Sequence, residues 1–185
     1  MSKKKISTRT FTPKKEDTII FDTNILIYLF YPIDYNNTYQ EYNYLYKKIL
    51  KSKSSLIISS IQVSEFINKC IRLQFDLYKE DQGNSKMEFK KDYRSTEDYK
   101  NSMDAILGIM EHDIMEHFQL ADDNFSAMQK EKLFLYAYSY DFNDAFLVEF
   151  ARIQNAILVT NDTDFANYNS DITIVTANQT LLKFR

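Results

Sequence analysis

The chain has 185 residues, of which 44% are hydrophobic, and its formal net charge is −3. This length and apolar content suit one domain with an ordinary core. No window approaches the roughly 18 apolar residues of a membrane span, and the basic start lacks the apolar region of a signal peptide, so we expect a cytoplasmic protein. With Cys70 as the single cysteine and two histidines, an internal disulfide and a zinc site of thiolates and imidazoles are excluded. A bound metal would be a hard ion held by oxygen atoms.

The charges are distributed unevenly along the chain. Residues 1 to 53 carry ten Lys or Arg against five acids, whereas residues 97 to 171 carry four against fifteen. The basic end could contact phosphates, and the acidic stretch must be solvated or bind cations. Residues 1 to 17 show no periodicity, and we interpret them as a basic arm; the alternative is a disordered, solubilising tail.

The first half of the chain predicts two strands, each followed by helical sequence. The apolar run TIIF at residues 18–21 predicts a strand that ends at Asp22 and leads into the helical run ILIYLF. A Tyr-rich helix is expected over 35–52, and a second strand over 55–59. The helix after this strand presents one apolar stripe, made of Val63, Phe66, Ile67, Cys70 and Ile71.

The middle of the chain is charged. Residues 79–94 predict a loop, within a charged helical insertion that we place around 79–117. A longer helix is expected after Ser95. A short third strand is predicted over 118–121, and another helix from 123 to about 136.

The last third predicts a helix from about 142, with Asp141 as its N-cap, and two more strands at 156–160 and 171–176. Short apolar strands separated by helices favour right-handed crossovers and a mostly parallel sheet covered on both faces. The fold class is therefore α/β, in one domain that spans residues 18–185.

Acidic side chains follow the predicted strands. Asp22 ends the first strand, Glu65 lies in the first turns of the helix after the second, and Asp162 follows the fourth. Ligands of open α/β sheets bind beyond the carboxyl ends of the strands, so these acids are expected at one edge. Topology places Asp144, at the start of its helix, near the same edge if the segment before this helix arrives from that edge of the sheet. We expect Asp164 to be an outer or alternative ligand.

Converging carboxylates repel one another unless a cation neutralises them. Mg²⁺ or Mn²⁺ held by carboxylates can activate a water molecule and stabilise the charge that grows on a phosphodiester. This chemistry needs no nucleophilic side chain, in agreement with a sequence that has no GxSxG, HExxH or P-loop pattern.

Each acid also has a structural explanation. Asp22 suits a helix N-cap, and Glu65 lies opposite the apolar stripe, as a solvated surface residue would. Asp144 suits a first-turn acid that interacts favourably with the helix dipole. Asp162 and Asp164 suit a simple acidic turn.

Four motifs resemble, in the same order, the acidic motifs of PIN domains. They are IIFDTNILIYL, SSIQVSEF, DFNDAFLVEFA and ILVTNDTDF, and the resemblance spans residues 18 to about 175. It implies that the catalytic, metal-binding acids are Asp22, Glu65, Asp144 and Asp162. It also implies that Asn24 and Thr160 are supporting polar residues.

The PIN resemblance implies a three-layer fold around a five-stranded, mostly parallel sheet, with Mg²⁺ or Mn²⁺ as cofactor. It implies endonucleolytic cleavage of single-stranded RNA, often by the VapC-type toxin of a toxin–antitoxin pair. An antitoxin protein and a homodimer are then the expected partners. The basic arm and the 79–117 segment depart from the compact toxin form, so a processing nuclease stays open.

Two other functions remain as alternatives. A Mg²⁺-dependent phosphatase also uses an acid at a strand end, but the haloacid-dehalogenase pattern wants a second Asp where this chain has Asn24. The other alternative is a non-catalytic PIN-like module that binds RNA or protein.

Overall fold

The structure is a computed structural model of the chain, and it describes residues 4–31, 37–134, 141–167 and 171–183. Its centre is a sheet of six strands in the order β1-β6-β5-β2-β3-β4. The strands are β1 (Lys4–Ser7), β2 (Thr18–Phe21), β3 (Ser55–Ile58), β4 (Phe118–Leu120), β5 (Ile157–Val159) and β6 (Thr173–Thr176). Every pair of neighbours is parallel. The α/β class and the five predicted strands are confirmed.

The sixth strand, β1, was not predicted and lies in the segment that we interpreted as a basic arm. It pairs with β6, from Lys4 beside Thr173 to Ser7 beside Thr176. Its sequence KKIS has one apolar side chain and is partly exposed, as an edge strand tolerates. Because β1 has neither an apolar run nor alternation, its sequence lacks the pattern that identifies a strand.

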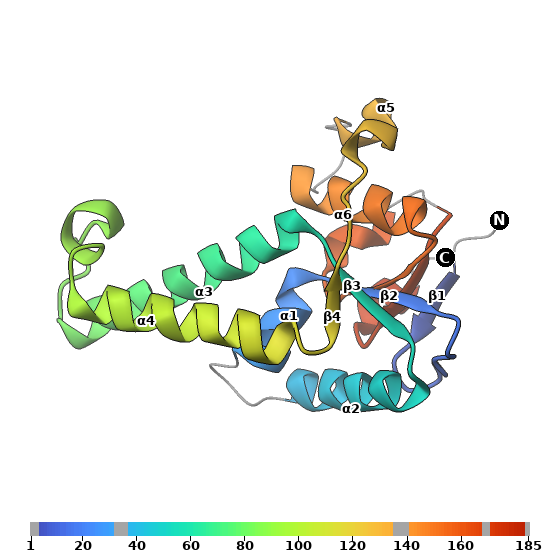
Figure 1. Ribbon diagram of the computed structural model, residues 1–185, viewed down its shortest axis with the longest axis horizontal. Coiled ribbons are helices and arrows are strands. Elements are labelled where there is room, and N and C mark those ends of the chain that lie inside the picture. Colours follow the sequence, from blue (N-terminus) through green and yellow to red (C-terminus); the bar gives the residue numbers. More distant parts are fainter. Residues whose placement is uncertain (1–3, 32–36, 135–140, 168–170, 184–185) are drawn as a thin grey trace.

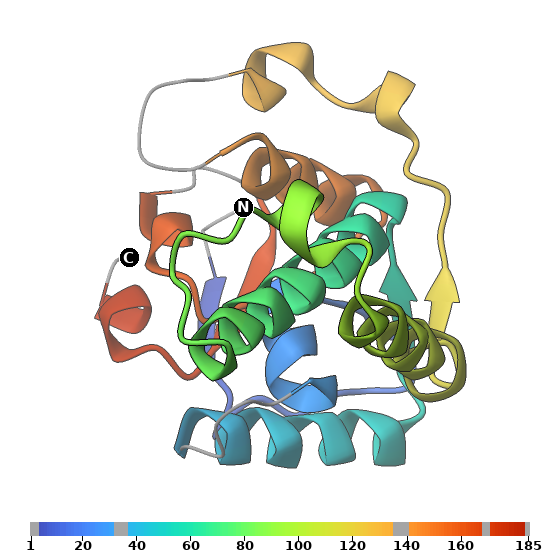
Figure 2. The same ribbon diagram turned by 90° about the vertical axis from the view of Figure 1, so that its left-hand side faces the viewer.

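The sheet is the middle of three layers. Successive residues of each strand face opposite sides of the sheet, so each strand contributes side chains to a hydrophobic core on either face. Ile19 and Phe21 of β2 belong to one hydrophobic core, and Ile20 belongs to the other. The first core is covered by α1 (Thr23–Phe30), α2 (Asn37–Ser52), α3 (Ser60–Asp81) and α4 (Glu97–Gly108), and the second by α6 (Phe142–Ile153) and α7 (Gln179–Lys183). Figures 1 and 2 show these layers.

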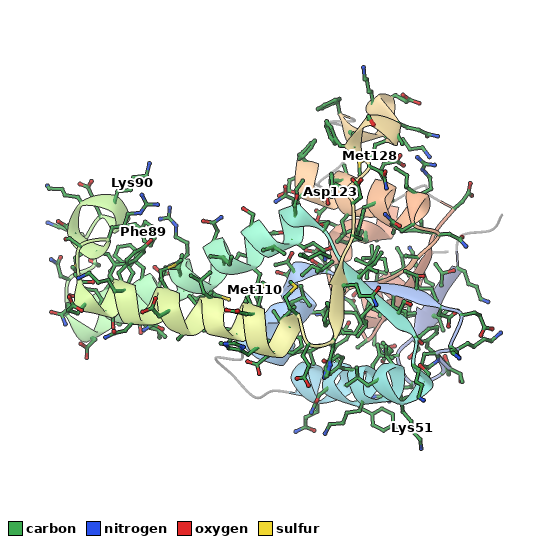
Figure 3. All side chains as sticks on the ribbon, in the orientation of Figure 1. Lys51, Phe89, Lys90, Met110, Asp123 and Met128 are labelled. Carbon is green, nitrogen blue, oxygen red and sulfur yellow. The ribbon has the colours of Figure 1, made fainter. Side chains whose placement is uncertain are left out.

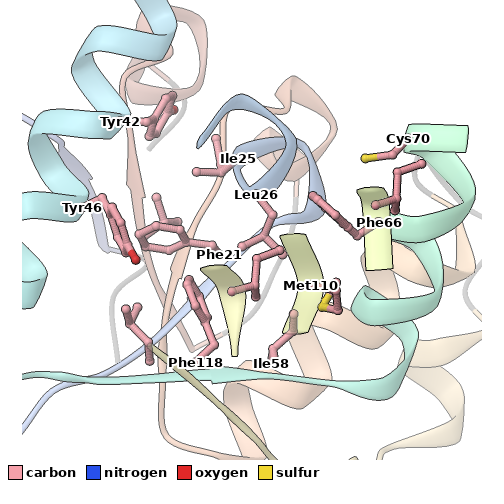
Figure 4. Close-up of a cluster of buried hydrophobic side chains, with 14 of the residues drawn as sticks. Phe21, Ile25, Leu26, Tyr42, Tyr46, Ile58, Phe66, Cys70, Met110 and Phe118 are labelled. Atoms are coloured by element: carbon pink, nitrogen blue, oxygen red, sulfur yellow. The ribbon is translucent and has the colours of Figure 1, made fainter. Parts of the chain in front are cut away.

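Aromatic rings fill the first core where β2 meets α2 and β4. The Phe21 ring packs edge to face on Phe118, with centroids 5.7 Å apart, and on Tyr46 at 6.1 Å (Figure 4). Cys70 is fully buried in the same core, as expected for a structural thiol. Among the described residues, no helix is long and apolar enough to cross a membrane.

The helices α3 and α4 form a hairpin that projects from the body of the molecule (Figures 1 and 2). The loop predicted over 79–94 begins later than expected, because α3 continues to Asp81. A π-helical turn at Phe89–Tyr93 replaces part of the predicted loop. Phe89 lies near the tip of the hairpin (Figure 3), and its ring centroid is 5.4 Å from that of Phe75. The hairpin thus has an aromatic core of its own.

The prediction of one helix over 123–136 is wrong for residues 123–134. Residues 135 and 136 lie outside the described residues. The structure has a 3₁₀ turn at Phe125–Ala127 and a short α5 at Lys130–Leu133. Asn124, with φ of 49°, is left-handed and interrupts a regular helix. The N–H of Gln129 donates to the Glu149 carboxylate at 3.0 Å instead of continuing a helical ladder.

Candidate metal-binding active site

Asp22 lies at the carboxyl end of β2, where the sheet meets α1. Its N–H donates to the Val159 carbonyl at 2.8 Å, which extends the pairing of β2 with β5 by one residue. Its side chain accepts from the Asn24 N–H at 3.3 Å and is the N-cap of α1. The Thr160 hydroxyl donates to the second carboxylate oxygen at 2.7 Å. Asp22 is therefore both a helix cap and a buried acid at the edge of the sheet.

Thr160 links the ends of two neighbouring strands. It follows β5, is fully buried, and accepts from the Asp162 N–H at 3.0 Å while it donates to Asp22. The Asp162 carboxylate accepts in turn from the Asp164 N–H at 2.9 Å. These hydrogen bonds hold the loop after β5 in a tight turn beside Asp22.

Tyr42 of α2 fixes the same loop from the helical layer, and its role was not predicted. Its hydroxyl lies 3.0 Å from both the Thr160 carbonyl and the Asn161 side-chain oxygen, and it accepts from the Ala177 N–H at 3.0 Å. Burial raises the pKa of Tyr42 to about 12, so the hydroxyl stays protonated and can donate. One side chain thus ties the loops after β5 and β6 to α2.

Glu65 lies in the second turn of α3 and points to α1. The Thr23 hydroxyl donates to one of its carboxylate oxygens at 2.8 Å, and the Lys69 ammonium lies 2.9 Å from the other. Lys69 also donates to the Asn24 side-chain oxygen at 3.0 Å. Lys69 was not predicted as a site residue, although its position four residues after Glu65 on a helix was a usable signal.

Asp144 lies in the first turn of α6, three residues after the N-cap Asp141, whose carboxylate accepts from the Asp144 N–H at 3.1 Å. Burial, together with the charges of Asp141, Asp22 and Asp162, raises the pKa of Asp144 to about 7. Burial and the charges of Asp162 and Asp141 also raise the pKa of Asp164. Asp144 therefore lies within the combined negative field of the acids that follow β2 and β5.

We refer to Asp22, Glu65, Asp144 and Asp162 as the acidic site. The structure brings Asp22 and Asp162 together through Thr160, and electrostatic coupling joins Asp144 to both. Glu65 is turned to Thr23 and Lys69. In the described part of the chain, no three acids, histidines or cysteines are grouped closely enough to hold one metal ion. The oxygen donors fit the chemistry of a hard ion, but this arrangement does not form a closed set of ligands.

The pKa of Asp22 makes stability depend on pH. Burial raises it from 3.8 to about 6, which corresponds to about 3 kcal/mol. The folded state disfavours the charged carboxylate of Asp22. The free energy of unfolding therefore falls by this amount as the pH rises from about 4 to 6.

We therefore expect metal-free Asp22→Asn protein to be more stable than wild type at pH 8, by up to about 3 kcal/mol. This advantage should shrink as the pH falls below 6 and vanish near pH 4. Urea unfolding in EDTA at pH 8, 6 and 4.5 measures it. An equal difference at all three pH values would show that the Asp22 charge is not the cause.

A cavity of about 450 Å³ adjoins the acidic site between α1 and α3. Apolar side chains line part of it, among them Ile27, Tyr28 and Leu73, while Glu65 and Lys69 line it on the side of the acids. Small solutes can therefore reach Glu65 of the acidic site from this side.

Comparison with known proteins agrees with this geometry. The PIN domain family matches residues 19–170. A chain in the crystal structure of VapBC2 from Rickettsia felis, bound to a DNA fragment from their promoter, has a similar fold, with a TM-score of 0.50 and 21% identity over 86% of this chain and 98% of that chain. No curated protein matches. Since the family match covers most of the chain and includes all four acidic motifs, the protein belongs to the PIN domain family.

Proposed function

We propose that the protein is a metal-dependent endoribonuclease that hydrolyses phosphodiester bonds of single-stranded RNA. The observation that carries this proposal is the coupling of Asp22, Asp144 and Asp162 at the carboxyl edge of a parallel sheet. Burial and the charges of Asp141, Asp22 and Asp162 together raise the pKa of Asp144 to about 7, and a cation bound beside these carboxylates would relieve their repulsion. Membership of the PIN family supports the same conclusion.

The ion would be held by Asp22, Asp144 and Asp162, with Asp164 as an outer ligand. When bound, Mg²⁺ or Mn²⁺ would supply an activated water molecule and stabilise charge on the phosphate. Thr160 orients the Asp22 carboxylate through its 2.7 Å hydrogen bond. Asp141 is committed to capping α6, so it contributes charge but is less free to ligate.

The decisive experiment is cleavage of a panel of single-stranded RNA and DNA oligonucleotides with Mg²⁺, Mn²⁺ or EDTA. We expect cleavage of RNA with either metal and none with EDTA, because without a cation the acids repel the phosphate and cannot stabilise the charge that grows on it. Asp22→Asn protein is the control for a contaminating nuclease. Cleavage that persists in EDTA would contradict the proposal.

The alternative of a non-catalytic module has one observation in its favour, the lack of a closed ligand set among the described residues. Thermal unfolding separates the two. If the acidic site binds an ion, Mn²⁺ at a hundred times its Kd should raise the Tm by roughly 5 to 10 °C. The matched control is Asp22→Asn protein, in which the shift should be much smaller. A Tm that Mn²⁺ leaves unchanged in wild type would favour the non-catalytic module.

A toxin role with an antitoxin partner is part of the same proposal, supported by the family and by the VapBC2-like fold. A toxin should arrest growth when it is expressed alone, and a small protein encoded next to it should relieve the arrest. Growth without arrest would favour a processing nuclease. Light scattering in solution tests the expected homodimer.

A further inference from the structure

Lys69 places a positive charge inside the acidic site. Its ammonium lies 2.9 Å from a carboxylate oxygen of Glu65 and donates to the Asn24 side-chain oxygen at 3.0 Å. Burial tends to lower the pKa of Lys69, but the hydrogen bond and charge of Glu65, with the charges of Asp22 and Asp144, raise it overall. Lys69 is therefore a charged ammonium that interacts with three of the four acids.

The hydrogen bonds of Glu65 leave it poorly placed to bind a metal ion. Both of its carboxylate oxygens are engaged, one by the Thr23 hydroxyl at 2.8 Å and the other by Lys69. A divalent ion bound by Glu65 would have to displace the Lys69 ammonium or lie directly beside it. Two cations at such a separation repel one another strongly, particularly where the side chains are shielded from water.

The opposite side of the acidic site has an excess of negative charge. The groups that act on Asp144 there are the carboxylates of Asp141, Asp22 and Asp162. Asp22 lies between the two sides, since Glu65, Lys69 and Asp144 all interact with it. Lys69 forms its ion pair with Glu65 on the α3 side, whereas Asp22 and Asp162 meet through the neutral Thr160 hydroxyl, so the negative charge is less compensated on the α6 side.

We propose that Lys69 is a positioning residue that acts as a fixed cation of the acidic site, holding Glu65 and confining the divalent ion to the side of Asp144 and Asp162. The acidic site then binds one divalent ion, and Glu65 acts through Lys69. This inference rests on the proposed metal dependence. It revises the sequence-based expectation that Glu65 is a direct metal ligand.

Lys69 is also accessible to solutes, because its side chain is 41% exposed and lines the cavity between α1 and α3. A change at this position therefore removes a charge at the border of the cavity without opening the buried core. Lys69→Met keeps most of the length of the unbranched side chain and removes the charge. Lys69→Arg keeps the charge and is the matched control.

The experiment is isothermal titration of the full-length protein with Mn²⁺ at pH 8. We expect one ion per wild-type chain, and a Lys69→Met affinity that is tighter by about tenfold or more, because a repelling charge has been removed. A second ion per chain in Lys69→Met protein would support the proposal equally. Lys69→Arg protein should behave like wild type. A merely structural role would weaken binding, so tighter binding identifies the role of the charge.

The inference is overturned, while the proposed function stands, by equal Mn²⁺ affinity in wild type and Lys69→Met protein, or by weaker affinity in Lys69→Met protein whose circular dichroism shows an intact fold. Wild type that binds two ions with Lys69 in place would also overturn it. If wild type shows no Mn²⁺ binding that Asp22→Asn removes, the proposed metal dependence itself fails. The proposed role of Lys69 then fails with it.

Discussion

Asp22→Asn should lower the rate of metal-dependent RNA cleavage by more than about a hundredfold and leave the fold intact. Loss of a residue that only supports a metal ligand already costs about 10- to 100-fold, and Asp22 is the acid coupled to both sides of the acidic site. The amide has nearly the shape of the carboxylate but no charge to hold the ion. Single-turnover cleavage at saturating Mn²⁺ measures the effect.

Asp104→Asn is the matched control, since Asp104 is an exposed acid on α4 and loses the same charge. It should cleave at the wild-type rate. Unimpaired cleavage by Asp22→Asn protein would remove Asp22 from the reaction. Equal losses in both variants would show that net charge, and not the acidic site, controls the rate.

Glu149→Ala should destabilise the protein by about 3 to 5 kcal/mol, the usual effect of breaking a buried ion pair. The Glu149 side chain is fully buried in α6. Arg152 donates to both of its carboxylate oxygens, with a shortest distance of 2.7 Å, and the Gln129 N–H donates at 3.0 Å. The alanine variant leaves these donors without an acceptor. Urea unfolding followed by circular dichroism at pH 7 gives the change in the free energy of unfolding.

The Glu149→Gln variant separates the effect of charge from that of shape, because its amide oxygen can still accept from the Gln129 N–H. Its loss of stability should be smaller than that of Glu149→Ala protein. Removing Arg152 as well should cost less than the sum of the two single changes, since neither group is then left without its partner. A loss below about 1 kcal/mol in Glu149→Ala protein would show that water replaces the pair.

Five of the six strands and the strand-end acids were predictable because their signals are local. The run TIIF and the Asp22 that follows it are contiguous in sequence, and parallel strands bring their carboxyl ends to one edge. The Asp141 cap of α6 was predictable for the same reason and is confirmed. The catalytic and metal-binding roles of the four acids remain predictions.

Other features depend on contacts between distant segments and were missed. Strand β1 is defined by its pairing with β6, which its own sequence does not reveal. Glu149 stands in an apolar run, and its hydrogen bond with Gln129 helps to explain why the expected helix after residue 123 is broken. Lys69 had a local signal in its spacing from Glu65, but its contact with Asn24 joins two helices. These features follow from tertiary packing.

The Tyr42 hydroxyl, which joins the loops after β5 and β6 to α2, affects how the acidic site meets its ligands. Loops that must be ordered at binding lose conformational entropy at that moment, and their affinity falls accordingly. Here the loop that carries Asp162 is held by a ring buried in the core. Its conformational entropy is lost when the chain folds. The backbone that carries Asp162 is therefore preorganised, and an arriving ion has only the Asp162 side chain left to arrange there.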